Sequence, residues 1–294
     1  MSSLFFSTAP ATDIHVRVTR PDTHTEKPLL VFLHYWGGSS STWYKLTSTK
    51  GQTPVSFEYP TAAIDLRGWG KSAHQAEGEG QHSISAMAAD VASVLSQLEQ
   101  QQENKSLLAH DFVLVGHSMG AKVGVASLSN LAAPLLAKLK GIVLVAPAPP
   151  TALILPPEMK EQQKVAYESE ESVRWTVTNV LANAAKLDDK DMQTVVRDSL
   201  SGTALAKAAW PSYGMEEDIS QDVKWVIASS VSGLRVRVLA GESDIVEPRD
   251  RVEKEVVQFL KDAGADVSLR VVEDVKHLIP LESPEAVYEE VTSF

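Results

Sequence analysis

The sequence predicts an α/β fold, a mostly parallel and doubly wound sheet into which a helical cap is inserted. Short apolar runs bounded by glycine, proline and aspartate alternate with longer stretches of helical period, as in sheets covered by helices on both faces. Two of these runs are apolar throughout, which is typical of buried central strands. A span of about 85 residues, 147–231, holds helical stretches and no convincing strand. We therefore predict a core domain of residues 1–146 and 233–294 and a helical cap of residues 147–232.

The strands can be placed in order along the chain. Residues 14–18 alternate apolar and polar side chains, as an antiparallel edge strand does when one of its faces is wet. The remaining strands are the apolar and β-branched runs at 28–34, 61–66, 112–115, 141–146, 234–240 and 266–272. The runs at 112–115 and 141–146 contain only apolar residues, so we place them at the centre of the sheet.

Helices are expected between these strands. In residues 83–102, apolar side chains recur at the i, i+3, i+4, i+7 spacing of a helix with one buried face. Further helices are predicted after Met119, at 248–263 and at 283–294, where Ser283 precedes Pro284 as an N-cap. In the cap, helix starts are predicted at 156–157, 170–171 and 188–189, and the acidic run 158–171 is interpreted as a solvated helix face.

Composition narrows the function classes. The 294 residues carry 27 basic and 38 acidic side chains, a formal charge of -11, which offers no basic footprint to nucleic acid or to an anionic membrane. Without cysteine there is no thiolate metal site, and no motif for a metal or cofactor is present. No signal peptide or apolar stretch approaching the ~20 residues of a membrane span is seen. We expect a cytoplasmic monomer or homodimer that acts on a small molecule without a cofactor.

The sharpest local signal is the pentapeptide GHSMG at residues 116–120. It follows the strand at 112–115 directly and precedes a predicted helix, the setting of a serine exposed on a tight strand-to-helix turn. In isolation the pentapeptide could equally be a turn with an incidental serine, but the flanking elements favour a nucleophile. Ser118 is therefore the candidate nucleophile.

A serine hydroxyl needs a base, and on this kind of turn the order along the chain is serine, acid, histidine. His277 is the one histidine beyond the 116–120 turn, and it lies just past the strand at 266–272. Asp244 follows the strand at 234–240 and is the candidate acid that orients the base; Glu242 is the runner-up. An acid after the strand at 141–146 is excluded, because no carboxylate follows until Glu158.

Acyl transfer also needs N–H donors for the oxyanion that forms during the reaction. The backbone N–H of Met119, next to the serine, is one candidate, and that of Trp36 in the glycine-containing loop after residues 28–34 is the second. The side chains of His34 and Trp36 are interpreted as packing residues. The loop DLRGWGKS at 65–72 lacks phosphate-binding spacing, so we interpret it as structural, with Asp65 and Arg67 able to pair locally.

In combination, HYWGGS, DLRGWGKS, GHSMG, GESDIVEP and KHLIPLESPE resemble the α/β-hydrolase superfamily over residues 13–146 and 233–294. The likeness is greatest to its cofactor-free serine members, such as small carboxylesterases, lactonases, carbon-carbon bond hydrolases and perhydrolases. The resemblance implies an eight-stranded sheet, a cap after the sixth strand, and a triad of Ser118, Asp244 and His277. Two departures stand out: Tyr35 occupies a position that is usually glycine, and Lys276 precedes the histidine where glycine is usual.

The leading hypothesis is a serine hydrolase that cleaves a small ester or lactone through an acyl-enzyme on Ser118. The alternatives are a carbon-carbon bond hydrolase with the same triad and a non-catalytic ligand-binding protein on the same fold. A cofactor-free oxygenase acting through the His-Asp pair is a further, weaker alternative. Four cap aromatics are expected to be available to line a pocket: Trp175, Trp210, Tyr213 and Trp225.

Overall fold

The fold is built on one large sheet. The computed structural model describes residues 2–72 and 81–294, and in this part of the chain eight strands are hydrogen-bonded in the order β1-β2-β4-β3-β5-β6-β7-β8. Pairs β1–β2 and β2–β4 are antiparallel and the remaining neighbours are parallel. The predicted fold class is therefore confirmed. The strands are β1 (Ser2–Ala9), β2 (Thr12–Thr19), β3 (Leu29–Leu33), β4 (Thr61–Ile64), β5 (Phe112–His117), β6 (Leu139–Val145), β7 (Arg235–Gly241) and β8 (Asp266–Val272).

The N-terminal end of the sheet differs from the prediction. Strand β2, expected to be an exposed edge strand, is covered by β1, which pairs with it from Ser2 opposite Val18 to Ala9 opposite Thr12. Its polar residue His15 is buried instead of facing water, because its ring contacts the Asp65 carboxylate and packs against the Phe5 ring. The sequence of β1, SSLFFSTA, carries only a short apolar run, so its strand character depends on pairing with β2, which residue periodicity does not show.

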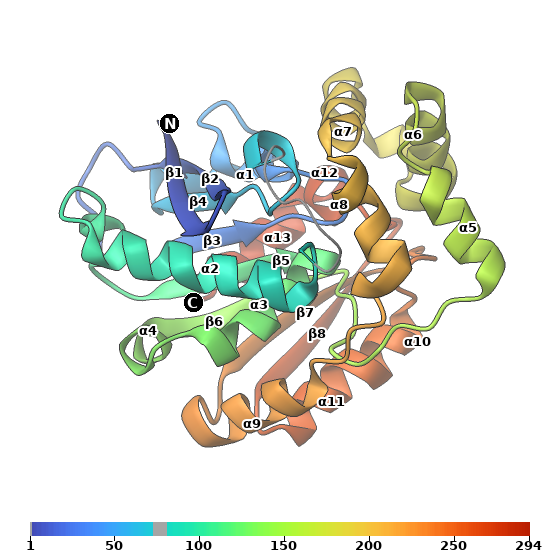
Figure 1. Cartoon of the computed structure of the whole chain (residues 1–294). Helices are drawn as coiled ribbons and strands as arrows, with labels where there is room; N and C mark the ends of the chain where they lie inside the picture. The colour runs from blue at the N-terminus through green and yellow to red at the C-terminus, as the bar shows by residue number, and fades with distance from the viewer. Residues whose placement is uncertain (1, 73–80) are drawn as a thin grey trace.

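Helices cover both faces of the sheet, and the side chains of β3 show why. Leu29, Val31 and Leu33 belong to one apolar cluster, whereas Leu30 and Phe32 belong to another on the opposite face. Successive side chains of a strand point to opposite faces, so a strand that is apolar throughout needs cover on both. Helix α2 (Ile84–Gln100) and helix α3 (Met119–Ser127) lie in front of the sheet and α13 (Pro284–Val291) behind it (Figure 1).

The predicted helices between the strands are confirmed with small changes. The side chain of Ser83 caps α2 by accepting from the N–H of Ala86. The stretch predicted at 248–263 is a helix whose middle, Val252–Val257, is π-helical. The other helices of the core are α1 (Tyr44–Thr47), α4 (Ala133–Lys138), α10 (Arg249–Arg251), α11 (Gln258–Asp262) and α12 (Ile279–Glu282).

Between β6 and β7 the described chain forms helices and no strand, and we keep the name cap for residues 147–232. Its helices are α5 (Pro157–Val165), α6 (Glu170–Thr176), α7 (Asp189–Ser201), α8 (Ala204–Ala209) and α9 (Ser220–Ser230). Helices α5 to α8 gather at one end of the sheet (Figure 1). Helix α5 has no buried residue, as expected for the acidic stretch that was interpreted as a solvated face. Among the described residues, no helix is long and apolar enough to cross a membrane.

Buried polar contacts fasten the cap to the core. The ammonium of Lys45, on α1, lies 2.8 Å from a carboxylate oxygen of Asp191, on α7. The buried Lys122, on α3, donates from Nζ to the carbonyl oxygens of Thr151 and Met215 at 3.0 and 3.1 Å. Since a buried ammonium without such partners is costly, these contacts hold the start of the cap close to the helix that follows Ser118.

Candidate active site

Ser118 lies on a strained turn between β5 and α3. Its backbone has a φ of 54° and a ψ of -115°, outside the regions that side-chain-bearing residues favour. The turn is closed by hydrogen bonds from the Ser118 N–H to Val145 O (2.9 Å) and from the Ala121 N–H to Ser118 O (3.0 Å). Gly120 permits close packing, since a Cβ there would lie 2.5 Å from the backbone oxygens of Leu33 and His34. The geometry holds Ser118 at the carboxyl end of a central strand.

His277 and Asp244 are brought together from two neighbouring strand ends. Nδ1 of His277, after β8, lies 2.8 Å from Oδ2 of Asp244, after β7, and both side chains are buried. The second carboxylate oxygen of Asp244 accepts the backbone N–H groups of Val246 and Glu247 at 2.8 and 3.1 Å. A carboxylate can only accept, so the proton of this contact is on Nδ1, and Nε2 of His277 is left free to act as a base.

The environment adjusts the proton affinity of His277. Burial lowers the pKa of His277, but the charge of Asp244 and its hydrogen bond more than offset this, so that the pKa lies above its ordinary value. The neighbouring His117 helps to hold the backbone at His277, since Nε2 of His117 lies 2.8 Å from the carbonyl oxygen of His277. Burial, together with the nearby His277, holds the pKa of His117 well below its ordinary value, so this ring stays neutral.

Ser118 and His277 line one cavity of about 140 Å³ at the boundary between core and cap. Most of its wall is apolar or aromatic, with Tyr35, Trp36, Tyr167 and Trp210 among the lining residues. Within residues 2–72 and 81–294, neither the Ser118 hydroxyl nor Nε2 of His277 has a hydrogen-bond partner. In acyl-transfer sites the hydrogen bond between the serine hydroxyl and Nε2 of the histidine often tightens only when the substrate is bound.

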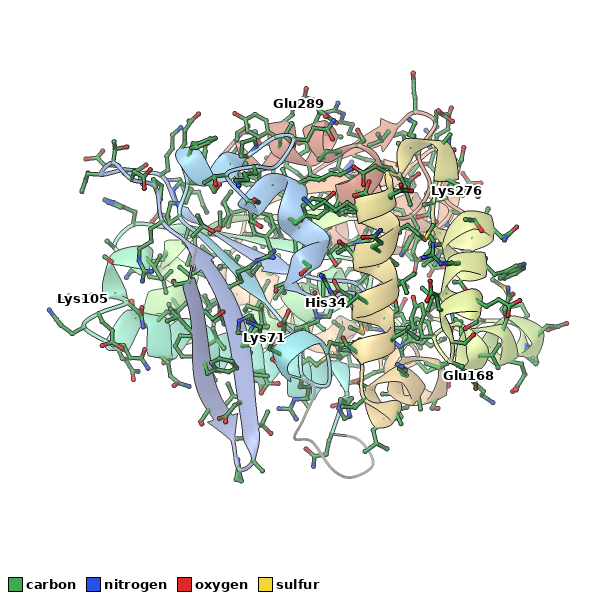
Figure 2. The ribbon with its side chains drawn as sticks, turned by 90° about the horizontal axis from the view of Figure 1, so that it is seen from above. His34, Lys71, Lys105, Glu168, Lys276 and Glu289 are labelled. Atoms are coloured by element: carbon green, nitrogen blue, oxygen red, sulfur yellow. The ribbon has the colours of Figure 1, made fainter. Side chains whose placement is uncertain are left out.

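The loop after β3 faces the cap and forms part of the cavity wall. His34 lies in the interior of the molecule between the strands and the cap helices, whereas Lys105 and Glu289 lie at its rim (Figure 2). Nε2 of His34 accepts the N–H of Leu66 at 3.0 Å, which is the packing role expected for its side chain. The Trp36 ring also fastens the cap, through Nε1 to Lys207 O at 3.1 Å.

The backbone N–H groups of Trp36 and Met119 have no hydrogen-bond acceptor among the described residues. Tyr35, which occupies the position where the resembling family usually has glycine, does not adopt a positive φ; the left-handed residue of this loop is Gly37, with a φ of 96°. The substitution at residue 35 is therefore accommodated without backbone strain. Both candidate donors remain available for an oxyanion.

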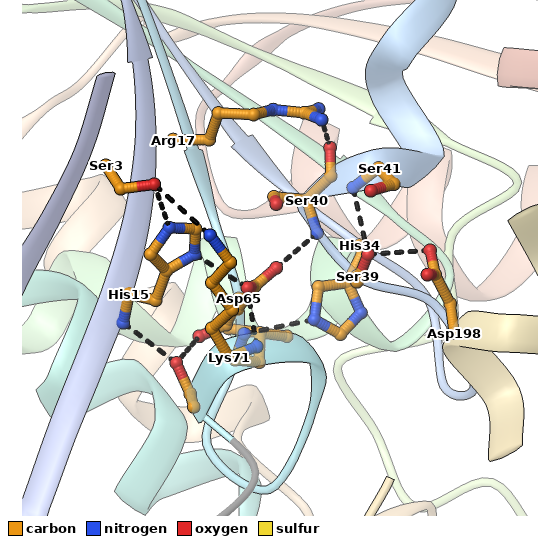
Figure 3. Close-up of polar contacts among 12 residues, drawn as sticks. Ser3, His15, Arg17, His34, Ser39, Ser40, Ser41, Asp65, Lys71 and Asp198 are labelled. Atoms are coloured by element: carbon orange, nitrogen blue, oxygen red, sulfur yellow. Dashed lines mark hydrogen bonds and ion pairs between the residues drawn. The ribbon is translucent and has the colours of Figure 1, made fainter. Parts of the chain in front are cut away.

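A second polar cluster surrounds Asp65 (Figure 3). Its carboxylate accepts from Nδ1 of His15 at 2.7 Å and from the backbone N–H groups of Ser40 and Lys71 at 2.5 and 2.9 Å. Nε2 of His15 lies 2.9 Å from Oγ of Ser3. The cluster joins β1, β2 and the loops after β3 and β4, which agrees with the structural role expected for residues 65–72.

The local pairing expected between Asp65 and Arg67 is wrong, and the runner-up acid Glu242 has another partner than His277. Asp65 does not pair with Arg67, because Arg67 binds both carboxylate oxygens of Asp90, on α2. Glu242, the runner-up acid, accepts the backbone N–H of Asp274 at 3.0 Å. His277 makes its hydrogen bond to Asp244 instead.

The prediction for the cap aromatics is largely wrong. Of the four expected residues, Trp210 lines the cavity and Tyr213 does not, while Trp175 and Trp225 are 50% and 68% exposed. Tyr167, which was not considered, lines the cavity and donates from its hydroxyl to the carbonyl oxygen of Trp36 at 2.9 Å. Which cap residues face the core depends on how the helices dock, and no local pattern encodes that.

Glu247 is a second residue that sequence reasoning missed. It is 1% exposed, lines the cavity, and stands three residues after Asp244. The available signal was its position in GESDIVEP, three residues after the candidate acid Asp244 and directly before Pro248.

Comparison with known proteins gives one family match. The model of the Alpha/beta hydrolase family matches residues 30–290. No curated protein matches the chain in sequence.

Three solved structures are similar over nearly the whole chain. A bromoperoxidase from Bacillus anthracis has a TM-score of 0.75 at 14% identity, covering 99% of each chain. A thermophilic esterase from Thermogutta terrifontis has 0.70 at 19% identity, covering 100% of this chain and 97% of the other. An enol-lactonase from Burkholderia xenovorans has 0.70 at 18% identity, covering 99% and 98%. At such identities the similarity shows a shared fold.

Proposed function

Because the chain belongs to the alpha/beta hydrolase family, we propose that it is a serine hydrolase that cleaves a small ester or lactone through an acyl-enzyme on Ser118. The observation that carries this proposal is the 2.8 Å hydrogen bond between His277 and Asp244 at a cavity that Ser118 also lines. The strained backbone of Ser118 supports it, since strain of this kind clusters at active sites.

In the acylation step, Oγ of Ser118 attacks the substrate carbonyl carbon while Nε2 of His277 takes the hydroxyl proton. Asp244 stabilises the imidazolium that results. The backbone N–H groups of Trp36 and Met119 donate to the oxyanion of the tetrahedral intermediate. The bond to the leaving oxygen then breaks, and His277 returns the proton to that oxygen, so that an alcohol departs from an ester. In a lactone the new hydroxyl stays attached to the acyl chain.

In the deacylation step a water molecule replaces the alcohol. His277 takes a proton from this water as the hydroxide oxygen attacks the acyl carbonyl carbon, and it then protonates Oγ of Ser118 as the acyl bond breaks. The products are a carboxylic acid and the free serine. Each step returns His277 to its neutral form. One water is consumed in deacylation for each bond cleaved.

The cavity favours a small and largely apolar substrate. It measures about 140 Å³ and is lined mainly by apolar and aromatic side chains, and the described residues of its wall include no lysine or arginine. The fold is shared with structures named as an esterase and an enol-lactonase, so ester and lactone cleavage are reactions that this fold can host.

A panel of short esters, lactones, thioesters and diketone-like compounds, assayed with the wild type and with Ser118→Ala, tests the proposal. We expect hydrolysis of at least one short ester or lactone by the wild type and loss of that activity in the variant. Circular dichroism of Ser118→Ala provides the folding control. Unchanged hydrolysis by the folded variant would overturn the nucleophile, and cleavage confined to diketone-like compounds would favour the carbon-carbon bond hydrolase.

A further inference from the structure

The carboxyl group of Glu247 is a polar element of the cavity wall that the proposed mechanism does not use. The side chain is 1% exposed and lines the same cavity as Ser118 and His277. Its backbone N–H donates to Oδ1 of Asp244 at 3.1 Å, so the residue is held in register with the acid of the His-Asp pair. Glu247 therefore has a fixed place beside the reacting groups.

One of its two carboxyl oxygens has no partner in the part of the chain that the structure describes. Oε2 accepts from Nη1 of Arg251 at 3.2 Å, and Arg251 also donates to the carbonyl oxygen of Val246 at 3.0 Å. Within the described residues, Oε1 of Glu247 makes no hydrogen bond. A polar atom in a buried wall is stabilised when a bound molecule supplies the missing partner.

The surrounding charges select against ionic partners. Asp244 would repel an anion, and Arg251 already supplies a positive charge to the carboxyl. Burial raises the pKa of Glu247 to about 8, and the nearby Arg251 and His277 only partly oppose this. Near neutral pH the group is therefore mainly a carboxylic acid, which can donate a hydrogen bond as well as accept one.

We infer that Glu247 forms a polar subsite that hydrogen-bonds an amide group of the substrate, next to the ester or lactone bond that is cleaved. This inference rests on the proposed function and adds a substrate class to it, namely acylamino esters and lactones. An amide offers a carbonyl acceptor and an N–H donor, so it matches the carboxyl in either protonation state. The aromatic wall contributed by Tyr35, Trp36, Tyr167 and Trp210 accommodates the rest of the molecule.

Matched pairs of esters test the subsite. Ethyl N-acetylglycinate and ethyl pentanoate have acyl chains of equal length and differ by an amide; a second pair carries the amide in the alcohol part, as the acetate of N-acetylethanolamine against pentyl acetate. We expect a wild-type preference for the amide in kcat/KM in at least one pair. Glu247→Leu should reduce that preference at least tenfold, while Glu247→Gln retains it.

A control variant and a second measurement keep the test decisive. Glu253→Leu removes the exposed acid of a matched i,i+4 pair with Arg249. It should change kcat/KM for neither the amide ester nor the alkyl ester. If Glu247→Leu does not fold, the wild type is assayed with a ketone in place of the preferred amide. The preference of the wild type for the ketone ester over the alkyl ester, measured in kcat/KM, should fall as pH rises through about 8. The reason is that an ionised Glu247 carboxylate cannot donate a hydrogen bond to a ketone.

The outcomes separate this inference from the proposed function. Equal loss of both members of each pair in Glu247→Leu, or a wild type without any preference for the amide, would overturn the subsite while ester hydrolysis stands. Absence of hydrolysis of every ester, or hydrolysis that does not depend on Ser118, would overturn the proposed function itself.

Discussion

The described part of the chain holds two buried His-Asp pairs, and comparing them shows what distinguishes a candidate active site from a structural cluster. His277–Asp244 and His15–Asp65 have Nδ1 to Oδ2 distances of 2.8 and 2.7 Å, and each histidine has a serine nearby. In the His15 pair the serine contact is already made, at 2.9 Å to Ser3. A continuous Ser-His-Asp chain of hydrogen bonds is therefore present at the pair for which we propose no chemistry.

The difference lies in the setting of the serine. Ser3 is an exposed residue within the regular strand β1, whereas Ser118 has a φ of 54° and faces an aromatic cavity at the start of a helix. In the proposed reaction, backbone N–H groups beside Ser118 donate to the oxyanion. Around Asp65, by contrast, the N–H groups of Ser40 and Lys71 are used to hold the carboxylate itself. The surroundings of the hydroxyl, and not the hydrogen-bond chain alone, mark the candidate nucleophile.

The largest expected effect contrasts the two serines. Ser118→Ala should lower kcat for a short ester by about four to six orders of magnitude, because the covalent step is lost. Ser3→Ala should leave kcat within about twofold, since it removes one exposed hydroxyl. Steady-state kinetics on both purified variants measures this. A large loss in Ser3→Ala with activity retained in Ser118→Ala would reverse the assignment of the two pairs.

Replacing the two aspartates should affect different properties, activity for Asp244 and stability for Asp65. Asp244→Asn should lower kcat by about 10³ to 10⁴, because the imidazolium loses its stabilising charge. Asp65→Asn should change kcat little but lower the free energy of unfolding by about 1–3 kcal/mol, since the buried donors lose one of the two acceptor oxygens and the negative charge. Denaturant unfolding monitored by fluorescence, combined with kinetics, separates the two effects. Similar losses of activity in both variants would argue against a purely structural role for Asp65.

The comparison also explains which parts of the account were accessible from the sequence. The turn at residues 116–120 and the pair Asp244–His277 depend on motifs at strand ends and on their order along the chain, so they could be predicted. The pair His15–Asp65 could not, since the two residues are 50 positions apart and meet only when β2 and β4 pair. Likewise, β1 could not be predicted because its strand character depends on pairing with β2. The place of Tyr167 in the cavity could not be predicted because it depends on how the cap docks.

A third prediction concerns Glu247, the buried carboxyl next to the His277–Asp244 pair. Glu247 has a folded pKa of about 8 against 4.5 in the unfolded chain, so the folded state retains a proton that the unfolded state releases between these values. Stability contributed by this group is therefore lost as pH rises from about 4.5 to 8. Glu247→Gln should be more stable than the wild type at pH 9, by on the order of 4 kcal/mol, and similar to it at pH 4.

Urea unfolding at the two pH values tests this prediction. Glu253→Gln, which alters an exposed acid on the same helical stretch, serves as the matched control. An equal effect of Glu247→Gln at pH 4 and pH 9 would show that ionisation of the buried carboxyl is not the cause.

The smallest expected effect is on the pH profile. As a base, His277 must be neutral, so kcat/KM should rise with pH through a pKa above 6.5, and the residual activity of Asp244→Asn should show a lower midpoint because the carboxylate that raises the pKa is gone. His15→Gln should leave the midpoint unchanged. If the midpoint shifts in His15→Gln and not in Asp244→Asn, the catalytic base belongs to the His15–Asp65 pair.

Trapping the covalent intermediate tests the central claim most directly. The wild type is mixed with a slowly deacylating ester, quenched in acid, and its peptides are mapped by mass spectrometry. We predict one acyl group on the peptide that contains Ser118 and none on the peptide that contains Ser3. Acylation of Ser3, or turnover of the ester with Ser118 never acylated, would contradict the account.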